Sequence, residues 1–145
     1  MSIANYSTSI SPVKTAGEIM KMLSTHGVTN ISVSYDEGVQ SGLSFIITTE
    51  FGDRDFSLPI RIDGVLQTMK SDHTIPRSKC TREQATRVAW RIARDWLRAQ
   101  LALIEAGLAG LDEVMMPYMV GEQGQTMWEL YTGGQRQIEQ SRETS

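Results

Sequence analysis

The spacing of apolar residues changes twice along this chain, and that change limits the folds open to it. Residues 12–26 and 81–105 repeat apolar side chains every three or four positions, which predicts an amphipathic helix in each segment. Residues 30–62 alternate apolar and polar side chains instead, which predicts strands with one apolar face. Because the helices flank a run of strands rather than alternating with them, we expect an α+β fold.

Two turn-rich breaks divide the alternating segment into three strands. The first break is DEGVQSG at residues 36–42, and the second is FGD at residues 51–53. Such short breaks predict an antiparallel meander whose apolar face is covered by the first and the long helix. Pro59 cannot donate a backbone hydrogen bond, so we expect either that the third strand lies at an edge or that the backbone position of the proline faces outward. The predicted apolar face comprises Ile31, Val33, Tyr35, Leu43, Phe45, Ile47, Phe56, Leu58 and Ile60.

Capping residues mark where the two main helices begin. Ser11 followed by Pro12 is a typical N-cap with proline in the first turn, and Gly27 is placed to end that helix. Thr81 and Gln84 have the spacing of a capping box at the start of the long helix. These signals fix the helix boundaries before any packing is considered.

The chain of 145 residues suits one domain with a sizeable core. We predict a single α+β domain over residues 1–132 and a polar, flexible tail over residues 133–145. Short extra helices are expected after Asp63 and around residues 127–131.

Several features indicate action in the cytoplasm. The chain contains no apolar run near the roughly 20 residues that cross a membrane. Its N-terminus lacks the basic and apolar regions of a signal peptide. The single cysteine, Cys80, cannot form an internal disulfide, which agrees with a reducing compartment. We therefore expect a cytoplasmic protein without a membrane partner.

The long helix carries more apolar surface than one sheet can cover. Its apolar residues span about 200° of the helical wheel, whereas a surface helix needs about 100°. The excess face must meet either the C-terminal part of the chain or a second subunit, and we predict a homo-oligomer, most simply a two-fold dimer. Small residues would allow close approach of two helices: Ala85, Ala89, Ala93 and Ala99.

Four arginines form a cationic ridge on the same helix. They recur at steps of four, three and four, which places them within about 60° of one another on the helix. Arginine binds phosphate through bidentate hydrogen bonds, so the ridge is suited to nucleic acid or to a nucleotide-like anion. Residues 70–98 also hold eight of the fourteen basic residues and only three acids. The ridge residues are Arg87, Arg91, Arg94 and Arg98.

Neighbouring residues extend this candidate anion-binding surface. Arg77, Lys79 and Arg82 lie just before the ridge and would widen it. Trp90 lies at the border of the ridge, where its ring could stack on a base. An alternative is that Trp90 packs beneath the C-terminal segment, which is the ordinary use of such a residue.

A structural interpretation of the ridge stands beside the functional one. Glu83, Asp95 and Glu105 lie at helical spacing from the arginines and would partly neutralise them. Charged ridges of this kind are most often solvated faces with weak ion pairs. The sequence leaves both interpretations open.

Catalytic and metal-binding motifs are scarce in this sequence. We find no phosphate-binding glycine loop, no HExxH, no paired CxxC and no GxSxG. Asp72, His73 and Cys80 lie close together and could form a nucleophilic site, although an incidental thiol in an exposed loop is the interpretation we favour. We likewise interpret the acids in residues 50–55 as a polar hairpin tip rather than a cation site. We expect no catalytic residues, cofactor or metal.

Much of the chain resembles a family of small proteins encoded by bacteriophages and prophages. The likeness rests on RVAWRIARDWLRAQLALIEAGLAGLDEVMMPYM and on the upstream SYDEGVQSGLSFIITTEFGDRDFSLPIRIDGVLQTM, and it covers most of residues 13–131. That family brings no established activity or catalytic residues. The resemblance therefore implies a bacterial-virus context and action in the cytosol of a bacterial host.

A second likeness concerns the order of elements. A helix, a three-stranded meander and a helix resemble double-stranded-RNA-binding domains, which place basic residues at the start of their last helix. Lys79 and Arg82 occupy such a place here.

Three functions are compatible with these patterns. The first is a non-catalytic accessory protein that binds nucleic acid or a nucleotide-like anion, and the charge segregation favours it. The second is a protein-binding inhibitor or adaptor of a host protein, acting through the apolar helix face and the methionine-rich C-terminal region. The third, an enzyme that uses residues 72–80, has the least support. An acidic protein that mimics nucleic acid or blocks a basic host surface is a further alternative, because the net charge is −3.

Overall fold

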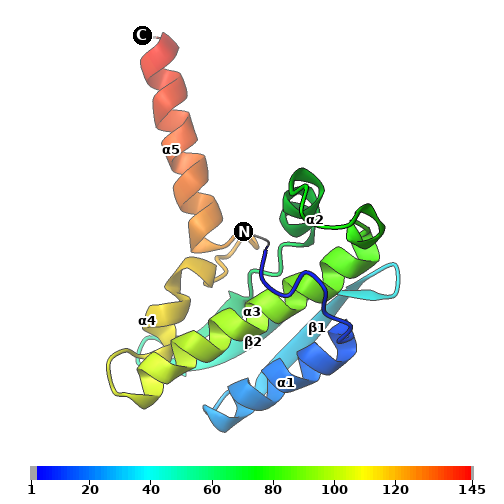
Figure 1. Cartoon of the computed structure of the whole chain (residues 1–145). Helices are drawn as coiled ribbons and strands as arrows, with labels where there is room; N and C mark the ends of the chain where they lie inside the picture. Colours follow the sequence, from blue (N-terminus) through cyan, green and yellow to red (C-terminus); the bar gives the residue numbers. More distant parts are fainter. Residues whose placement is uncertain (1–2, 145) are drawn as a thin grey trace.

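The computed structural model describes residues 3–144, with side chains up to residue 134 and that of Arg142. Figure 1 shows a three-stranded antiparallel sheet with two helices lying across one face, which confirms the predicted α+β fold. The described elements are α1 (Pro12–Thr25), β1 (Asn30–Asp36), β2 (Val39–Thr49), β3 (Gly52–Ser57), α2 (Ile62–Ser71), the 3₁₀ turn η1 (Arg77–Lys79), α3 (Arg82–Glu105), α4 (Leu111–Met115), the 3₁₀ turn η2 (Met116–Tyr118) and α5 (Met127–Thr144).

The sheet has the strand order β1-β2-β3, so the third strand lies at an edge as expected, but β3 ends at Ser57 and Pro59 lies beyond it, so the proline is not the reason. Ile31, Phe45 and Phe56 pair across the three strands, and the two phenylalanine rings stack with centroids 5.7 Å apart. Such aligned pairs on one face are the usual unit of sheet stabilisation. Tyr35 differs from the prediction: it is 62% exposed, because the register shifts between Ser34 and Tyr35 beside the β1–β2 turn.

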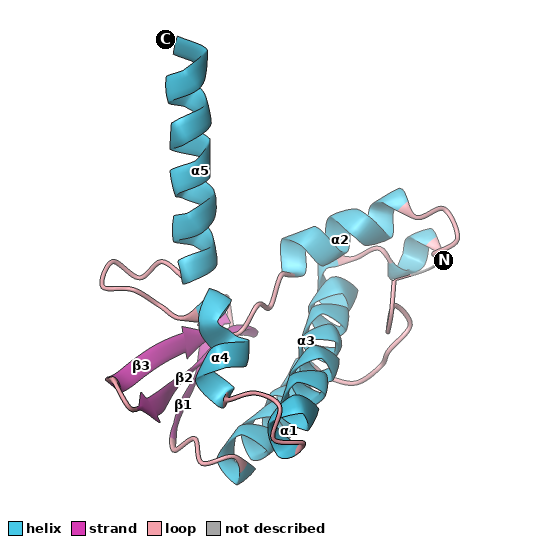
Figure 2. Cartoon of the chain, turned by 90° about the vertical axis from the view of Figure 1, so that its left-hand side faces the viewer, coloured by secondary structure: helices cyan, strands magenta, loops and turns pink. Residues whose placement is uncertain are grey.

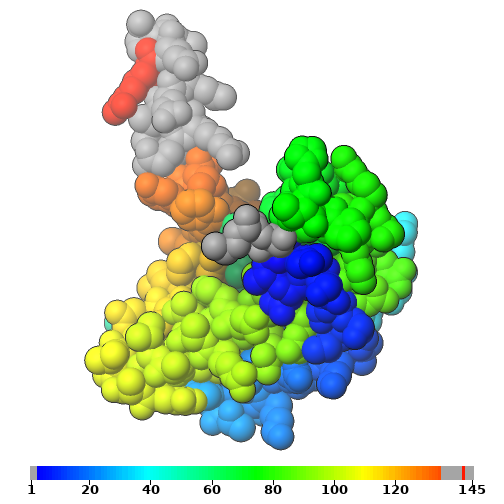
Figure 3. All heavy atoms as spheres, in the orientation of Figure 1, coloured from blue at the N-terminus to red at the C-terminus, as the bar shows by residue number. Residues whose placement is uncertain are grey.

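Helix caps form largely as the sequence indicated. The Ser11 side chain accepts a hydrogen bond from Lys14 N at 3.2 Å at the start of α1. Thr81 accepts one from Gln84 N at 3.1 Å at the start of α3. Gln84 does not complete the predicted capping box, since its side chain donates to backbone oxygens of Tyr6 and Thr8. Gln84 thus holds the N-terminal segment against α3. Figure 3 shows this segment beside α2.

Helix α3 packs into two hydrophobic clusters. Leu97 and Leu101 belong to the cluster shared with α1 and the sheet, whereas Val88 and Ala89 belong to the cluster shared with α2. Met115 of α4 is also buried in the first cluster. The wide apolar face of α3 is therefore covered within this chain by α1, α2, the sheet and the C-terminal part. A second subunit is therefore not needed to cover α3. The dimer remains a prediction, but the excess apolar surface of α3 no longer supports it.

The C-terminal part ends in a projecting helix. Figures 1 and 2 show α5 extending away from the sheet and from α1–α3. Its start is held by backbone hydrogen bonds from Met127 N to Met119 O and from Val120 N to Asp55 O on β3. The expectation of a short helix is corrected, because α5 continues to Thr144, whereas the flexibility expected of residues 133–145 stays a prediction; Ser145 lies outside the described residues.

No helix among residues 3–144 is long and apolar enough to cross a bilayer.

Candidate functional site

The centre of the arginine ridge faces α1 rather than solvent. Arg91 is only 9% exposed, and its Nη1 donates to Glu18 Oε2 at 2.5 Å. The same nitrogen lies 3.5 Å from Thr15 Oγ1 on α1. A guanidinium in this position is largely shielded from solvent and from any external phosphate. Arg91 therefore joins two helices.

The two arginines beside it are also paired. Arg94 Nη1 donates to Asp95 Oδ1 at 3.1 Å, and Arg94 Nε lies 3.4 Å from Glu18 Oε2. That second contact has the distance of an ion pair without hydrogen-bond geometry, so Arg94 Nε is buried without a hydrogen-bond partner. Arg87 Nη2 donates to Glu83 Oε1 at 2.7 Å. The ion pairs of Arg87 and Arg94 reduce the positive charge that the ridge presents to solvent.

Arg98 differs from the other ridge residues. It is exposed, and within the described part of the chain it makes no ion pair. Glu105, which continues the ridge in sequence, instead accepts from His26 Nε2 at 3.1 Å at the far ends of α1 and α3. The ridge thus consists of three arginines that form ion pairs with acidic residues of this chain and one exposed arginine.

Trp90 lies inside the core. Its exposed fraction is 0%, and its indole Nε1 donates to Gln40 O at 3.1 Å. The ring therefore cannot stack on an external base, and its assignment to a ligand site is corrected. Trp90 is buried because α1, α3 and the sheet pack together around its side chain. A buried indole N–H normally needs such a partner.

The flanking cations divide into two groups. Arg82 Nη1 donates to Asp63 Oδ1 at 2.5 Å, and this hydrogen bond is the main cause of the raised pKa of Arg82. Lys70, Arg77 and Lys79, which we call the basic group, make no ion pair among residues 3–134. Arg77 Nη1 lies within 3.5 Å of Lys70 O, which brings the C-terminal end of α2 and η1 together.

The possible nucleophilic site is not assembled. Asp72 accepts hydrogen bonds from the Thr74 hydroxyl and backbone N–H, which lower the pKa of Asp72. The Cys80 thiol instead points at backbone oxygens, with Met69 O at 3.4 Å. Asp72 and Cys80 thus interact with different neighbours. Among the described residues no group of three His, Cys, Asp or Glu side chains could hold a metal ion.

The first turns of α5 carry an exposed apolar surface, which we call the α5 patch. The Trp128 and Tyr131 rings lie 5.8 Å apart and are 46% and 59% exposed. Scattered exposed apolar residues are ordinary, but large adjacent ones mark interaction sites. The α5 patch consists of Met127, Trp128, Leu130 and Tyr131.

A capping box fixes the start of α5. Thr126 N and Oγ1 both donate to Glu129 Oε1, at 3.1 and 3.0 Å, and Glu129 N donates to Thr126 Oγ1 at 3.2 Å. These hydrogen bonds, the backbone one first, lower the pKa of Glu129. The Thr-x-x-Glu spacing is visible in the sequence, and it was a signal that our sequence analysis missed. The capping box therefore fixes where α5 begins, immediately before the α5 patch.

The sequence segment that includes the start of α5 is acidic. Residues 99–135 contain five acidic residues and no lysine or arginine. Four of the five acids are exposed and the fifth is half-buried. The acids are Glu105, Asp112, Glu113, Glu122 and Glu129.

Comparison with known proteins gave no match to a protein-family model, to a curated protein or to a solved structure. The bacteriophage context therefore stays a prediction from the sequence. The likeness to double-stranded-RNA-binding domains is limited to the order of one helix, three strands and a later helix.

Proposed function

We propose that this chain is a non-catalytic protein-binding module that docks through the α5 patch. The observation that carries the proposal is a projecting helix whose aromatic and aliphatic side chains are exposed at its anchored end. Burial of apolar surface is the main driving force of protein association, at about 25 cal/mol per Å². Tryptophan and tyrosine are also the residues most often found at energetic centres of interfaces.

The helix itself gains from a partner. Isolated helices shorter than about 12–15 residues are marginal in water, and longer ones still depend on packing of an apolar face. In the part of the chain that the structure describes, α5 packs chiefly against η2, at its base. A partner that covers the α5 patch would supply the packing that this helix lacks.

Charge indicates the kind of partner. The α5 patch lies within the sequence segment 99–135, which contains five acids and no lysine or arginine, although the charge of Arg61 also acts on Glu129. Complementary charge raises association rates and disfavours partners of the wrong sign. The occupant we propose is therefore another protein with an apolar groove rimmed by lysine and arginine, which agrees with an adaptor or inhibitor that blocks a basic surface.

The proposal is tested by co-purification from bacterial cells with three proteins, the wild type and two variants. Wild-type protein and Phe51→Ala should retain the same partner, whereas Trp128→Ala combined with Tyr131→Ala should lose it. Phe51 is the matched control, because it is an exposed aromatic residue in the β2–β3 turn. A partner retained equally by all three proteins would place the interface elsewhere.

A second candidate function keeps the anion-binding hypothesis but moves it from the ridge to the basic group. Lys70, Arg77 and Lys79 have no ion pair within residues 3–134, unlike Arg82, Arg87, Arg91 and Arg94. Non-specific nucleic-acid binding depends on such available cations. Affinity for single-stranded DNA that falls in Arg77→Gln combined with Lys79→Gln, and not in Arg87→Gln, whose side chain is paired with Glu83, would support this candidate.

A further inference from the structure

An apolar groove of about 450 Å³ lies between α2 and α3, beside η2 and the N-terminal segment. Its volume is within the range of small-molecule sites. The rings of Trp96 and Tyr118 line it and lie edge to face, with centroids 5.4 Å apart. Pro59, Val65 and Ile92 supply further apolar wall. Segments distant in sequence therefore meet to form a concave apolar surface that is separate from the α5 patch.

The charge on the wall of this groove is positive. Arg61, which immediately precedes α2, lines the groove and is exposed. Its guanidinium makes no hydrogen bond or ion pair with any residue in the described part of the chain, although its charge acts at longer range on Glu129. No acidic residue is found among the described residues that line the groove. The groove therefore combines an apolar wall with one available cation.

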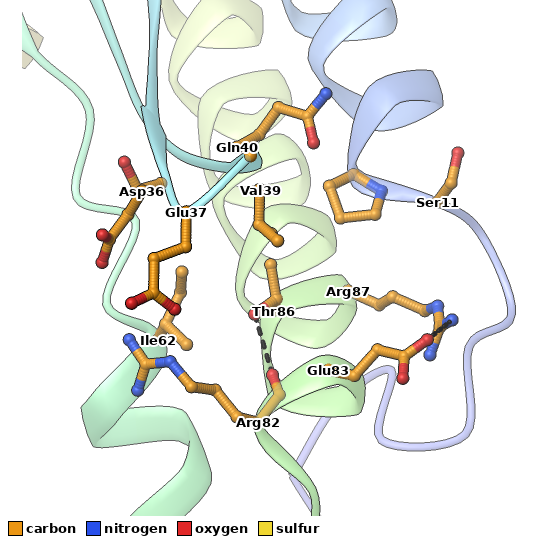
Figure 4. A pocket seen from close by; sticks show the side chains of 13 residues that line it. Ser11, Asp36, Glu37, Val39, Gln40, Ile62, Arg82, Glu83, Thr86 and Arg87 are labelled. Atoms are coloured by element: carbon orange, nitrogen blue, oxygen red, sulfur yellow. Dashed lines mark hydrogen bonds and ion pairs between the residues drawn. The ribbon is translucent and has the colours of Figure 1, made fainter.

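A second pocket, of about 480 Å³, shows the contrast. Figure 4 shows Arg82 and Arg87 on its wall, with acidic side chains close by. Both arginines are paired, Arg82 with Asp63 and Arg87 with Glu83. The pocket in Figure 4 thus offers a ligand no unpaired arginine, whereas the groove between α2 and α3 does.

We propose that the groove binds a free medium-chain carboxylic acid, with the carboxylate beside Arg61 and the aliphatic tail between α2 and α3. A guanidinium suits a carboxylate because its planar fork can donate two parallel hydrogen bonds. An exposed ion pair contributes little affinity, so burial of the tail supplies the larger part. The site does not depend on the protein-binding function proposed above.

Titration with hexanoate, octanoate and decanoate, followed by ¹H–¹⁵N spectra and calorimetry, tests this assignment. The amides of residues 61–68 and 89–96 should shift. Each added methylene should tighten binding by up to about fourfold until the groove is full. Octan-1-ol and octylammonium should bind more weakly than octanoate, because neither carries the charge that complements an arginine.

Three results of these titrations would overturn the proposal. The first is the absence of shifts with octanoate at millimolar concentration. The second is an affinity for octylammonium that equals the affinity for octanoate. The third is tighter binding of the peptide acetyl-Leu-Glu-Leu-amide than of octanoate, which would assign the groove to a segment of another protein.

A charge variant tests the role of Arg61. Arg61→Gln should weaken octanoate about threefold, within the range of an exposed ion pair, and leave octan-1-ol unchanged. Arg98→Gln is the matched control, because Arg98 is also exposed and makes no ion pair within the described part of the chain. Equal octanoate affinities of the two variants would contradict the assignment of the carboxylate to Arg61.

A glycine variant tests the groove itself. Gly64 of α2 lines it, and a Cβ at this position would meet no atom within 4 Å, so a leucine there has room to enter the groove. Gly64→Leu should weaken octanoate at least about tenfold, because several buried methylenes of the tail are displaced. Gly17→Leu on α1 is the control, since that helical glycine is also exposed with open space around it.

Both leucine variants remove a helical glycine and should be at least as stable as the wild type in urea. Unchanged octanoate affinity in Gly64→Leu would contradict the proposed position of the tail, and equal weakening by Gly17→Leu would contradict the choice of this groove.

Discussion

Arg91 on α3 and Glu18 on α1 join the two helices that cover the sheet, with Arg91 Nη1 2.5 Å from Glu18 Oε2. Arg94 approaches the same carboxylate, at 3.4 Å from its Nε. One carboxylate thus neutralises the middle of a ridge that looks cationic in the sequence. The ridge is largely a helix–helix contact, and this moves the candidate interface to the C-terminal part of the chain.

Glu18→Gln should lower the free energy of unfolding by about 2 kcal/mol, since it removes the charged partner of a nearly buried guanidinium. Urea denaturation followed by circular dichroism measures the change. Glu83→Gln removes an exposed partner of Arg87 and should cost no more than about 1 kcal/mol. Equal effects of the two substitutions would contradict the structural role of Arg91.

Arg91→Gln combined with Arg94→Gln should lower the midpoint of urea unfolding and leave any affinity for single-stranded DNA unchanged. The reason is that both arginines are engaged by Glu18. If they contacted phosphates instead, each loss would flatten the slope of log affinity against log salt by about 0.7. A flatter slope with unchanged stability would restore the ridge as a nucleic-acid interface.

Trp90→Phe should destabilise the fold by about 1–3 kcal/mol, because it leaves Gln40 O without its buried donor. Trp128→Phe, at an exposed position, should change stability by no more than about 0.5 kcal/mol. Thermal or urea unfolding compares the two variants. A Trp90→Phe protein as stable as Trp128→Phe would argue against the burial of Trp90.

The start of α5 should loosen in acid. The pKa of Glu129 is lowered from its ordinary value of 4.5 by the hydrogen bonds from Thr126. A group with a lowered folded-state pKa contributes stability above its ordinary pKa, and that stability is lost as the pH falls through the lowered value. The Thr126 amide signal should therefore stay constant from pH 7 to about 5 and titrate below 4.5, with no titration in Glu129→Gln. A midpoint at or above 4.5 would contradict this capping role.

Local patterns in the sequence predicted much of the fold. Alternation gives the strand faces directly, since successive side chains of a strand point to opposite sides. Ser11 and Thr81 predicted their helix starts because a cap depends on residues only two or three positions away. The length of α5 was not predicted, because Gly133, Gly134 and the polar residues after them are typical of a helix end.

The candidate site depended on contacts that a local pattern does not contain. Glu18 lies 73 residues from Arg91 in sequence, so its pairing with the ridge follows only from the packing of α1 on α3. Gln40 belongs to a segment interpreted as a turn, yet it is buried at the start of β2. The pairing of Glu83 with Arg87 could be predicted, because both residues lie on α3 four positions apart in the sequence.

The most direct test of the account is the affinity of the co-purified partner for wild-type protein and for the combined Trp128→Ala and Tyr131→Ala variant, measured by calorimetry. We predict that the variant binds at least about 30-fold more weakly, because a single central aromatic residue of an interface typically contributes 2 kcal/mol or more. The Phe51→Ala control should match the wild type, and all three proteins should unfold at the same urea concentration. An affinity for the double variant within about twofold of the wild-type value would contradict the assignment of the α5 patch as the protein-binding site.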